Sequence, residues 1–300
     1  MPKFLARDGK ELFYRDIGEG PCIFMIHGFG MHSGHWLPFA WLLSRNYRVI
    51  LPDLRGFGRS HLVNFYDKCS VSNYAHDLHD LVEHLDVPRF KLIAISMGAL
   101  TSLKYLEQHE SEKVERYMHI DQSPTCMNSK DWNWGLFGAE HTVRVDRAKA
   151  LIKELSPYIE ANVSFEEIPQ ALRNQIHSEL AEFFASALSK PIQKSIVRKL
   201  ISRERISKLV LPTENWTAYM RCLHAYINES YDFRGVLNTS QVPIDILVGM
   251  KSEMYPAAGQ LRMADLHSKS KVIAFPNSGH APLIDQPIKL ARELFKFAQH

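Results

Sequence analysis

The chain contains 300 residues, of which 36 are Lys or Arg and 33 are Asp or Glu, so its formal net charge is only +3. This small charge gives no reason to expect nucleic acid or an anionic membrane surface as a partner, and 45% hydrophobic residues are ordinary for a soluble globular protein. Because no apolar run approaches the roughly 18 residues that span a bilayer, and no signal-peptide pattern opens the chain, we expect a cytoplasmic monomer or homodimer without membrane insertion.

Short β-rich segments alternate with helical patterns over the first part of the chain and return near its end. The predicted strands are residues 11–17, 22–26, 47–51, 91–95, 115–120, 244–248 and 271–275. Apolar residues over 74–85 recur at the spacing of one helical face. The alternation predicts an α/β fold with a mostly parallel sheet and helices on both faces, whose site lies beyond the carboxyl ends of the strands.

The alternation stops between about residues 125 and 235, where helical patterns follow one another without a convincing strand. This change predicts an all-helical insertion. We therefore divide the chain into a core, 1–124 and 236–300, and a helical cap, 125–235, that covers the active site.

Ser96 follows the predicted strand 91–95 and precedes a helical stretch, within Ala94-Ile95-Ser96-Met97-Gly98. A serine at this position is most often a helix N-cap. An N-cap, however, does not explain the small residues two places before and after it. A sharp turn from strand to helix does, because the two elements then nearly collide and the serine hydroxyl stands clear of the sheet. Ser96 is therefore our candidate nucleophile.

A serine needs a base to remove its proton, and His280 is the candidate. It lies in the Gly- and Pro-containing segment "FPNSGHAPLIDQP", directly after the last predicted strand, at the same edge of the sheet as Ser96. His76 and His79, beside acidic residues, are better interpreted as a solvated helix face than as a metal site. The four scattered cysteines form no C-x-x-C pair and predict neither disulfides nor zinc.

An oxyanion site requires two backbone N–H groups aimed at one point. Met97, directly after the candidate nucleophile, supplies one in this interpretation. Phe29 supplies the other, within the "HGFG" segment that follows strand 22–26. The glycines of this segment let the backbone approach a substrate closely, so we also expect His27 and Gly28 to contact it.

The ordered motifs "HGFG", "LPDLRGFGRS" (51–60), the turn at Ser96 and "SGHAP" (278–282) resemble those of the α/β-hydrolase superfamily, in particular its esterase, lactonase and C–C hydrolase branches. The resemblance implies an eight-stranded, mostly parallel sheet and a cap inserted after the sixth strand. It also implies hydrolysis through a Ser–His–acid triad and an acyl-enzyme, with no metal or cofactor. It gives Asp53 and Arg55 a structural role only.

The third member of the triad is left open between two carboxylates. The family usually has Asp three residues after the glycine that ends the seventh strand, but here Gly249 is followed at that distance by Ser252. Glu253 is one residue further and has a longer side chain. Asp121, after the sixth predicted strand, is the alternative, because some branches place the acid there. Both keep the order nucleophile, acid, histidine.

Aromatic residues without helical spacing in "DWNWGLFG" (131–138) indicate the wall of a pocket. We expect Trp132, Trp134 and Phe137 to line it together with Met31. The predicted substrate is a small hydrophobic ester, lactone or thioester with an acyl or aromatic group. Phe183 and Phe184 are interpreted instead as the core of the helical cap.

Three alternatives remain open. A cofactor-free haloperoxidase or a C–C bond hydrolase would use the same Ser–His pair. A non-catalytic ligand-binding or sensor protein of the same fold would not need the acid. A dinucleotide-dependent oxidoreductase is suggested by Gly28, Gly30 and Gly34 with Asp53 after the next strand, but the chain lacks the Tyr-x-x-x-Lys pair of the short-chain enzymes.

Overall fold

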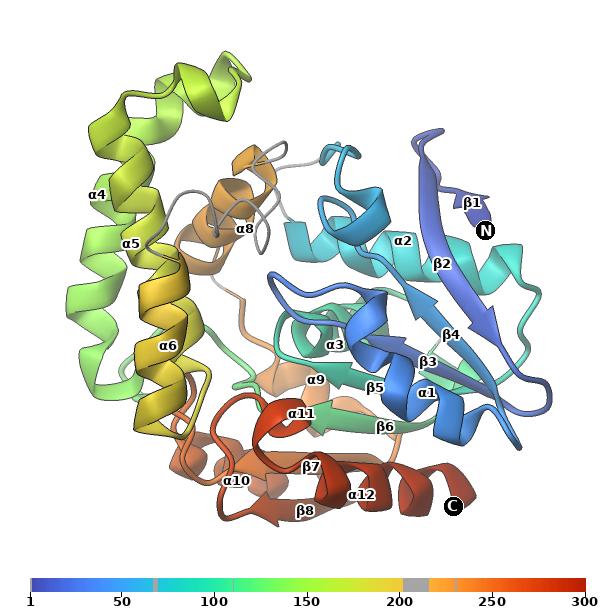
Figure 1. Cartoon of the computed structure of the whole chain (residues 1–300). Coiled ribbons are helices and arrows are strands. Elements are labelled where there is room, and N and C mark those ends of the chain that lie inside the picture. The colour runs from blue at the N-terminus through green and yellow to red at the C-terminus, as the bar shows by residue number, and fades with distance from the viewer. Residues whose placement is uncertain (1, 67–69, 110, 202–215, 230) are drawn as a thin grey trace.

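The eight strands of the computed structural model form one sheet, in the order β1-β2-β4-β3-β5-β6-β7-β8. The structure describes residues 2–66, 70–109, 111–201, 216–229 and 231–300. The strands are β1 (Lys3–Leu5), β2 (Glu11–Ile17), β3 (Cys22–Ile26), β4 (Arg48–Pro52), β5 (Phe90–Ile95), β6 (Val114–Ile120), β7 (Ile244–Gly249) and β8 (Ser270–Phe275). From β4 to β8 the neighbours run parallel, whereas β1 and β2 pair antiparallel at one edge (Figure 1). The predicted fold class is confirmed.

Helices cover both faces of this sheet. The α-helices of the described residues are α1 (Leu37–Leu43), α2 (Ser70–His84), α3 (Met97–Gln108), α4 (His141–Glu160), α5 (Gln170–Ser186), α6 (Pro191–Ile201), α8 (Trp216–Asn228), α9 (Arg234–Thr239), α10 (Ala257–Leu266), α11 (Pro282–Asp285) and α12 (Pro287–Gln299). Helices α1 and α12 contribute to one hydrophobic cluster, and α2, α3 and α10 contribute to another. The two clusters lie on opposite faces of the sheet.

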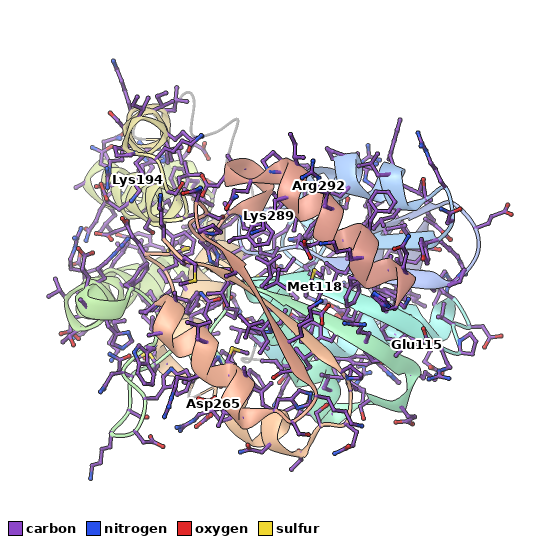
Figure 2. All side chains as sticks on the ribbon, turned by 90° about the horizontal axis from the view of Figure 1, so that it is seen from below. Glu115, Met118, Lys194, Asp265, Lys289 and Arg292 are labelled. Atoms are coloured by element: carbon purple, nitrogen blue, oxygen red, sulfur yellow. The ribbon has the colours of Figure 1, made fainter. Side chains whose placement is uncertain are left out.

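The fully buried strand β3 places successive side chains on opposite faces of the sheet. Ile23 and Met25 belong to the cluster under α1 and α12, whereas Phe24 and Ile26 belong to the cluster under α2 and α3. Figure 2 shows the molecule from below, with α12 lying across the strands and Met118 of β6 in the layer that this helix covers. A strand buried on both faces is typical of a parallel sheet, because helices exclude water from both sides.

The segment between β6 and β7 contains helices α4, α5, α6, α8 and α9. Figure 1 shows α4, α5 and α6 standing beyond the end of the sheet toward which β3, β5 and β6 point. Apart from two isolated bridge pairs, the described residues of the segment between β6 and β7 form no β-pairing. Of the helices that the structure describes, none combines the length and the apolar character needed to cross a membrane.

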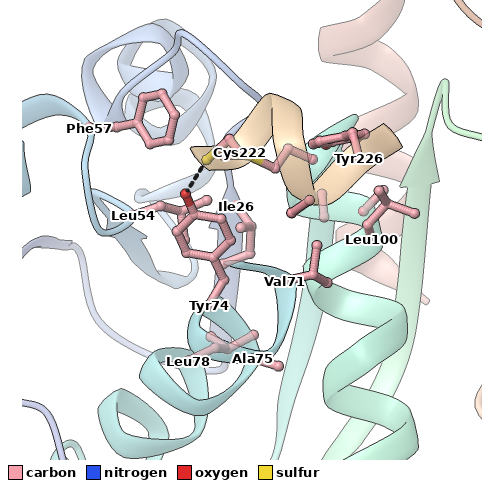
Figure 3. Close-up of a cluster of buried hydrophobic side chains, with 14 of the residues drawn as sticks. Ile26, Leu54, Phe57, Val71, Tyr74, Ala75, Leu78, Leu100, Cys222 and Tyr226 are labelled. Carbon is pink, nitrogen blue, oxygen red and sulfur yellow. Dashed lines mark hydrogen bonds between the residues drawn. The ribbon is translucent and has the colours of Figure 1, made fainter. Parts of the chain in front are cut away.

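Helix α8 is joined to the sheet through α2. The Tyr74 hydroxyl of α2 and the Cys222 Sγ of α8 are 3.0 Å apart, within a cluster that also includes Leu54 and Phe57 (Figure 3). Both side chains are buried, so the inserted helices and the sheet share one continuous hydrophobic core. Among the described cysteines, Cys22, Cys126 and Cys222 are free thiols, and Cys69 lies outside the described residues.

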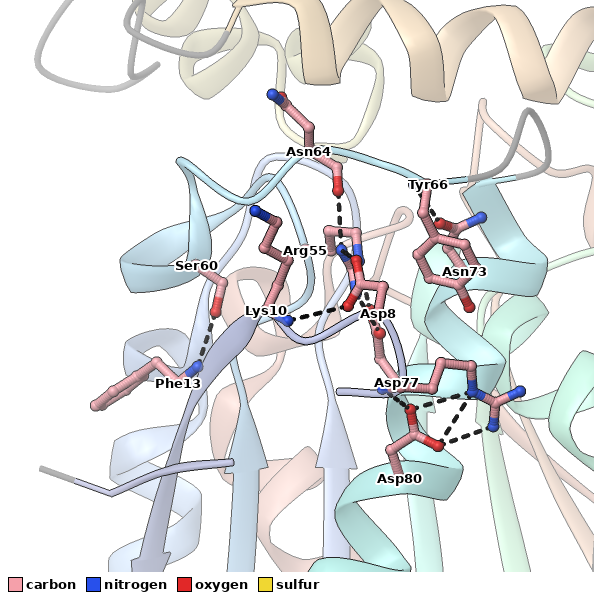
Figure 4. A network of polar contacts seen from close by, with 11 residues as sticks. Asp8, Lys10, Phe13, Arg55, Ser60, Asn64, Tyr66, Asn73, Asp77 and Asp80 are labelled. Atoms are coloured by element: carbon pink, nitrogen blue, oxygen red, sulfur yellow. Dashed lines mark hydrogen bonds and ion pairs between the residues drawn. The ribbon is translucent and has the colours of Figure 1, made fainter. Parts of the chain in front are cut away.

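Arg55, after β4, connects the first hairpin to α2 (Figure 4). Its guanidinium group is fully buried and forms two hydrogen bonds with the Asp77 carboxylate, at 2.9 and 2.7 Å. It donates two more to Asp8 and one to the Asn64 carbonyl oxygen. Because each buried charge has a partner, this network can hold the loop after β4 in place without an unpaired ion.

Candidate functional site

Ser96 lies at the junction between β5 and α3 in a backbone conformation that L-residues rarely adopt, with φ 55° and ψ −125°. Its side chain makes no capping hydrogen bond to the first turn of α3. The N-cap interpretation therefore does not explain why serine occupies this position. A strained residue of this kind costs about 1–3 kcal/mol, so the surrounding packing must hold it.

The close approach of two loops holds the junction in place. A Cβ atom on Gly98 would lie 2.7 Å from the carbonyl oxygens of both Ile26 and His27, which is closer than real Cβ contacts. A Cβ atom on Gly28 would lie 3.1 Å from the Cβ of Ser96. Only glycine at residue 98 therefore allows α3 to begin directly beside the end of β3.

Asp121, directly after β6, holds the imidazole of His280. The His280 Nδ1 and the Asp121 Oδ2 are 2.7 Å apart, and both residues are buried. Because a carboxylate only accepts hydrogen bonds, Nδ1 carries the proton in this pair. In the neutral ring this leaves Nε2 as the nitrogen that can accept a proton.

Three further donors surround the same carboxylate. The Gly249 N–H and the Gln260 side-chain amide each donate to Oδ1 at 2.9 Å, and the Ser252 hydroxyl donates to Oδ2 at 2.7 Å. With His280, the carboxylate thus accepts four hydrogen bonds. These bonds fix its orientation.

Glu253, the other candidate acid, lies elsewhere. Its side chain is 58% exposed, and its carboxylate forms an ion pair with Lys194 of α6. The structure therefore brings Asp121, and not Glu253, to His280. Ser252 occupies the position where the acid was expected, but it points its hydroxyl at Asp121 as a donor.

Two contacts place Ser96 and His280 at the same edge of the sheet. The Ser96 N–H donates to the Ile120 carbonyl oxygen at 3.1 Å, and Ile120 directly precedes Asp121. The ring of Tyr255 lies 5.8 Å from that of His280 and also lines the cavity onto which Ser96 opens. This is the carboxyl edge of the strands, where ligands bind in open α/β sheets.

The loop after β3 begins with two buried residues, His27 and Gly28. His27 Nδ1 lies 2.8 Å from the Gly28 carbonyl oxygen, and its Nε2 accepts a hydrogen bond from the Leu54 N–H at 2.9 Å. Burial lowers the pKa of His27 to about 4, so the ring is neutral at physiological pH. His27 thus braces this loop, whereas Phe29 lines the cavity.

The cavity beside Ser96 leaves about 50 Å³ for the centre of a water-sized sphere. It lies between the end of the sheet and the helices inserted after β6. Its lining is mostly apolar and consists of Phe29, Ser96, Leu136, Phe137, Arg144, Ala148, Leu151, Ile176, Glu179, Leu180, Phe183, Met220, Leu223, Tyr226, Met254 and Tyr255.

The aromatic residues expected at the cavity are only partly found there. Phe137 lines it, whereas Trp132 and Trp134 do not. The Trp132 indole N–H donates to the Ser123 hydroxyl at 3.1 Å, and both tryptophans pack against Gly259 of α10. Their side chains fill the space between the 131–138 segment and α10 and are therefore not available to a ligand in the cavity.

The expectations for Phe183 and Met31 also differ from the structure. Phe183, expected in the core of the helical cap, lines the cavity and contacts the Phe29 ring edge-on. Met31 packs with the cluster on the opposite face of the sheet and is not part of the lining. Phe184 is partly buried, and its ring would meet a Cβ atom at Gly30.

Most residues of the cavity lining, and Gln260 beside Asp121, were not identified from sequence. Gln260, Met254 and Tyr255 follow β7, and Arg144 lies on α4. Ser252 was named only as the residue that stands where the acid is usually found. A signal for its role was present, because a hydroxyl three residues after Gly249 can donate to an acid on the neighbouring strand.

No cluster of three metal-binding side chains occurs among the described residues. The His76 Nδ1 lies 3.0 Å from the His109 Nε2, and the rings of His79 and His109 stack 4.3 Å apart. The Asp53 carboxylate, which a dinucleotide site would need, accepts hydrogen bonds from the N–H groups of Ser33 and Arg59 at 2.6 and 2.8 Å. In the part of the chain that the structure describes, the Asp53 carboxylate is therefore already engaged and is not available to a ribose.

Comparison with known proteins identifies a family model and several relatives that match this chain. A sequence model of the alpha/beta hydrolase fold matches residues 21–287. A pimeloyl-[acyl-carrier protein] methyl ester esterase of Nitrosospira multiformis is 20% identical over 96% of this chain and 98% of its own length. A non-heme chloroperoxidase of Kitasatospora aureofaciens is 32% identical over 44% of this chain. The chain spans about half the length of that relative and of a Synechocystis relative, 48% and 54%.

Solved structures have the same fold. An esterase from Exiguobacterium antarcticum superimposes with a TM-score of 0.77 at 20% identity, covering 99% of each chain. An enol-lactonase from Burkholderia xenovorans LB400 superimposes with a TM-score of 0.70 at 17% identity, covering the whole of both chains.

Proposed function

Because the chain belongs to the α/β-hydrolase fold family, we propose that it is a serine hydrolase that cleaves a carboxylic ester with a hydrophobic acyl or aromatic group. The observation that carries this proposal is the buried His280–Asp121 pair at the same edge of the sheet as the strained Ser96, which lines an apolar cavity. The names of the relatives, which include esterases, support the same reaction class.

In the proposed mechanism, His280 Nε2 takes the proton of the Ser96 hydroxyl as its oxygen attacks the ester carbonyl carbon. Asp121 keeps the proton on Nδ1 and stabilises the imidazolium that forms. The imidazolium then protonates the alcohol oxygen as it leaves, and an acyl-enzyme remains. Water, deprotonated by the same nitrogen, releases the acid and restores the serine.

The oxyanion of the tetrahedral intermediate requires donors that are already in place. We assign the N–H groups of Phe29 and Met97 to this task. Met97 begins α3, where the first N–H groups of a helix have no partner within it. Phe29 lies in the loop that Gly28 brings against Ser96. Preorganised donors of this kind stabilise charge that develops in the transition state without reorganisation.

The helices between β6 and β7 act in this proposal as the cap, residues 125–235. Leu180 and Phe183 of α5, with Met220 of α8, supply much of the cavity wall. Burial of apolar ligand surface contributes about 25 cal/mol for each Å². A long acyl chain that packs against this wall therefore binds more tightly than an acetyl group.

A second candidate function is a cofactor-free haloperoxidase or perhydrolase activity. It is favoured by relatives that are named non-heme chloroperoxidase and bifunctional esterase/perhydrolase. Both candidates need the same activated serine. Assays with hydrogen peroxide and a carboxylic acid, beside the ester assays, distinguish them.

The test of the serine hydrolase proposal is covalent labelling. Incubation with a fluorophosphonate is expected to add one adduct to the wild-type protein, which intact mass measurement detects and peptide mapping assigns to Ser96. The Ser96→Ala variant is expected to lose the adduct and several orders of magnitude of p-nitrophenyl ester hydrolysis. Ser102→Ala is the matched control and keeps the adduct, because Ser102 lies in helix α3, which follows Ser96, and its hydroxyl donates to the Gly98 carbonyl oxygen.

Two results contradict the proposal. One is the absence of any adduct on the wild-type protein. The other is an adduct that persists in Ser96→Ala. The cavity part of the proposal is tested separately with p-nitrophenyl esters of increasing chain length, and a strict preference for acetate contradicts a hydrophobic acyl group.

A further inference from the structure

The loop that carries His280 is held by two side chains at the end of the short helix α11. The Asp285 Oδ2 accepts a hydrogen bond at 2.7 Å from the N–H of Gly279, the residue directly before the histidine. The Gln286 Oε1 accepts one from the Asn277 N–H at 3.0 Å. The chain thus turns back through α11 and fastens the segment in front of His280 from two adjacent positions.

The residue after the histidine is held by the helices that are inserted after β6. The Ala281 N–H donates to the carbonyl oxygen of Ala187, which follows α5, at 3.1 Å. A Cβ atom on Gly279 would lie 3.0 Å from the same oxygen and 3.2 Å from backbone atoms of the two residues that follow Ala187. His280 therefore lies between a side-chain anchor on one side and an anchor from the inserted helices on the other.

The Asp285 carboxylate gains little for the fold itself. Its other oxygen, Oδ1, is buried and has no hydrogen-bond partner among the residues that the structure describes. Because burial of a carboxylate oxygen without a partner is unfavourable, overall stability does not explain an acid at this position. Its hydrogen bond with the Gly279 N–H, next to His280, indicates a different role.

The imidazole of His280 must meet two partners at once. Its Nδ1 is 2.7 Å from the Asp121 Oδ2, and in the proposed mechanism its Nε2 takes the proton of Ser96. Neither partner can follow a displaced ring, because hydrogen bonds around β7 fix Asp121 and close backbone packing fixes the junction at Ser96. A displacement of about 1 Å at such a site can cost about a hundredfold in rate.

We propose that Asp285 is a positioning residue: by holding the Gly279 N–H, it fixes the backbone of His280 so that the ring reaches Asp121 and Ser96 together. The Ala187 carbonyl supplies the second anchor, so the base is aligned only while the inserted helices are docked on its loop. This inference rests on the proposed serine hydrolase function and adds to it a residue that lies outside the cavity lining.

Two variants of Asp285 separate the hydrogen bond from the side chain that makes it. Asp285→Ala removes the acceptor, whereas Asp285→Asn keeps an oxygen that can accept from the Gly279 N–H. For Asp285→Ala we expect kcat on p-nitrophenyl butyrate to fall about a hundredfold. His280 acts in both formation and hydrolysis of the acyl-enzyme, so both steps slow and KM stays within about a factor of two. Asp285→Asn is expected to retain most of the wild-type kcat.

Asp80→Ala is the matched control for a loss of stability. The Asp80 carboxylate also accepts a backbone N–H at 2.7 Å, that of Arg7, but it joins the first hairpin to α2 (Figure 4). We expect this variant to lower Tm at least as much as Asp285→Ala does and to retain the wild-type kcat. The comparison shows that a loss of kcat in Asp285→Ala does not follow from a less stable fold.

A second readout, which needs no turnover, is the NMR resonance of the His280 Nδ1 proton, because a proton bonded to a carboxylate is strongly deshielded. Isotope-labelled histidine reveals this resonance, and its absence in His280→Gln assigns it. We expect it to broaden or disappear in Asp285→Ala, as the ring leaves Asp121 and the proton exchanges with water. It should persist in Asp285→Asn and in Asp80→Ala.

Either an unchanged kcat or an intact resonance in Asp285→Ala overturns the inference and leaves the serine hydrolase proposal standing. Equal impairment of Asp285→Asn and Asp285→Ala overturns it as well, because the acceptor oxygen is then not what holds the loop. If the wild type cleaves no ester and takes no fluorophosphonate adduct, the serine hydrolase proposal fails. The resonance then decides by itself whether Asp285 holds His280 against Asp121.

Discussion

The four hydrogen bonds to the Asp121 carboxylate decide which residue can orient His280. Two donors come from backbone and side chain around β7, and one is the Ser252 hydroxyl. They leave His280 as the fourth donor, so the proton of the pair stays on Nδ1. A residue with a different pattern of donors and acceptors cannot keep it there.

Replacing Asp121 with Asn tests this directly. The amide nitrogen would face Nδ1 as a donor, which favours the ring tautomer that has its proton on Nε2 and cannot accept one from Ser96. We expect kcat to fall by about four decades, as in the serine-protease triad that serves as the template. Steady-state kinetics with a p-nitrophenyl ester measures it.

Glu253→Gln is the matched control, because it makes the same chemical change in a carboxylate that pairs with Lys194 at the surface. Exposed ion pairs contribute about 0–1 kcal/mol, so this variant is expected to retain nearly wild-type activity and stability. The opposite pattern, with Glu253→Gln inactive and Asp121→Asn active, would reject Asp121 as the orienting acid.

The choice between the two carboxylates shows where sequence reasoning reached its limit at this scale. Spacing from Gly249 leads to Ser252 and Glu253, and position after β6 leads to Asp121. Which of these carboxylates contacts His280 depends on the register between β6 and β7, where Ile120 pairs with Leu247. That register is a relation between segments more than 100 residues apart, and no local pattern records it.

At the scale of elements, the junction of β5 with α3 depends on the neighbouring end of β3. Gly98 lets the first turn of α3 approach the carbonyl oxygens of Ile26 and His27, and the same contact positions the loop that carries Phe29. The motif Ala94-x-Ser96-x-Gly98 predicted this packing from sequence, because steric requirements at a tight turn are local.

Gly98→Ala is therefore expected to damage the site more than the fold. Its Cβ would lie 2.7 Å from two backbone oxygens, which cannot rotate away as a flexible side chain would. Overpacking of this kind costs about 1–3 kcal/mol, and the shift it forces moves the N–H groups of Phe29 and Met97. We expect a lower free energy of unfolding in urea and a loss of kcat/KM of at least about a hundredfold.

Gly235→Ala provides the comparison. Gly235 lies in α9, and a Cβ atom there meets nothing within 4 Å. Alanine is favoured over glycine in a helix by about 1 kcal/mol, so this variant is expected to be as stable as the wild type or more so, with unchanged activity. If Gly98→Ala behaves like Gly235→Ala, the close approach at the junction is not what positions the site.

The remaining elements were predicted unevenly, for physical reasons. Strands 11–17 and 22–26 were predicted with their observed bounds, whereas β1, with three residues, is too short to carry a pattern. The helical character of the inserted segment followed from its periodicity. The periodicity did not show which aromatic residues of this segment face the cavity, because this depends on how separate helices pack. Phe183 lies in the lining, and Trp132 lies against α10.

At the scale of the whole molecule, stability is linked to pH through histidines that are buried in the neutral form. His119 is fully buried. Its Nε2 lies 2.9 Å from the Gln122 carbonyl oxygen, and its Nδ1 lies 2.8 Å from the Tyr117 hydroxyl. The carbonyl requires the proton on Nε2, so Nδ1 is the acceptor. Burial lowers the pKa of His119 to about 4, as it does for His27.

Acidification should therefore destabilise the folded protein before its carboxylates are protonated. The unfolded chain binds a proton at each of these histidines near its ordinary pKa of 6.5, whereas the folded protein does so only near pH 4. The stability that the neutral rings provide is complete above pH 6.5 and is lost as pH falls toward 4, by about 2 kcal/mol for each histidine at pH 5.

Urea unfolding at pH 7.5, 6 and 5 measures how steeply the free energy of unfolding falls with pH. His119→Gln, which retains a side-chain donor and acceptor but cannot be protonated in this range, is expected to lose stability at pH 7.5 yet show a slope smaller by the contribution of one histidine. Equal slopes in the wild type and in His119→Gln would mean that His119 accepts its proton as readily in the folded protein as in the unfolded chain.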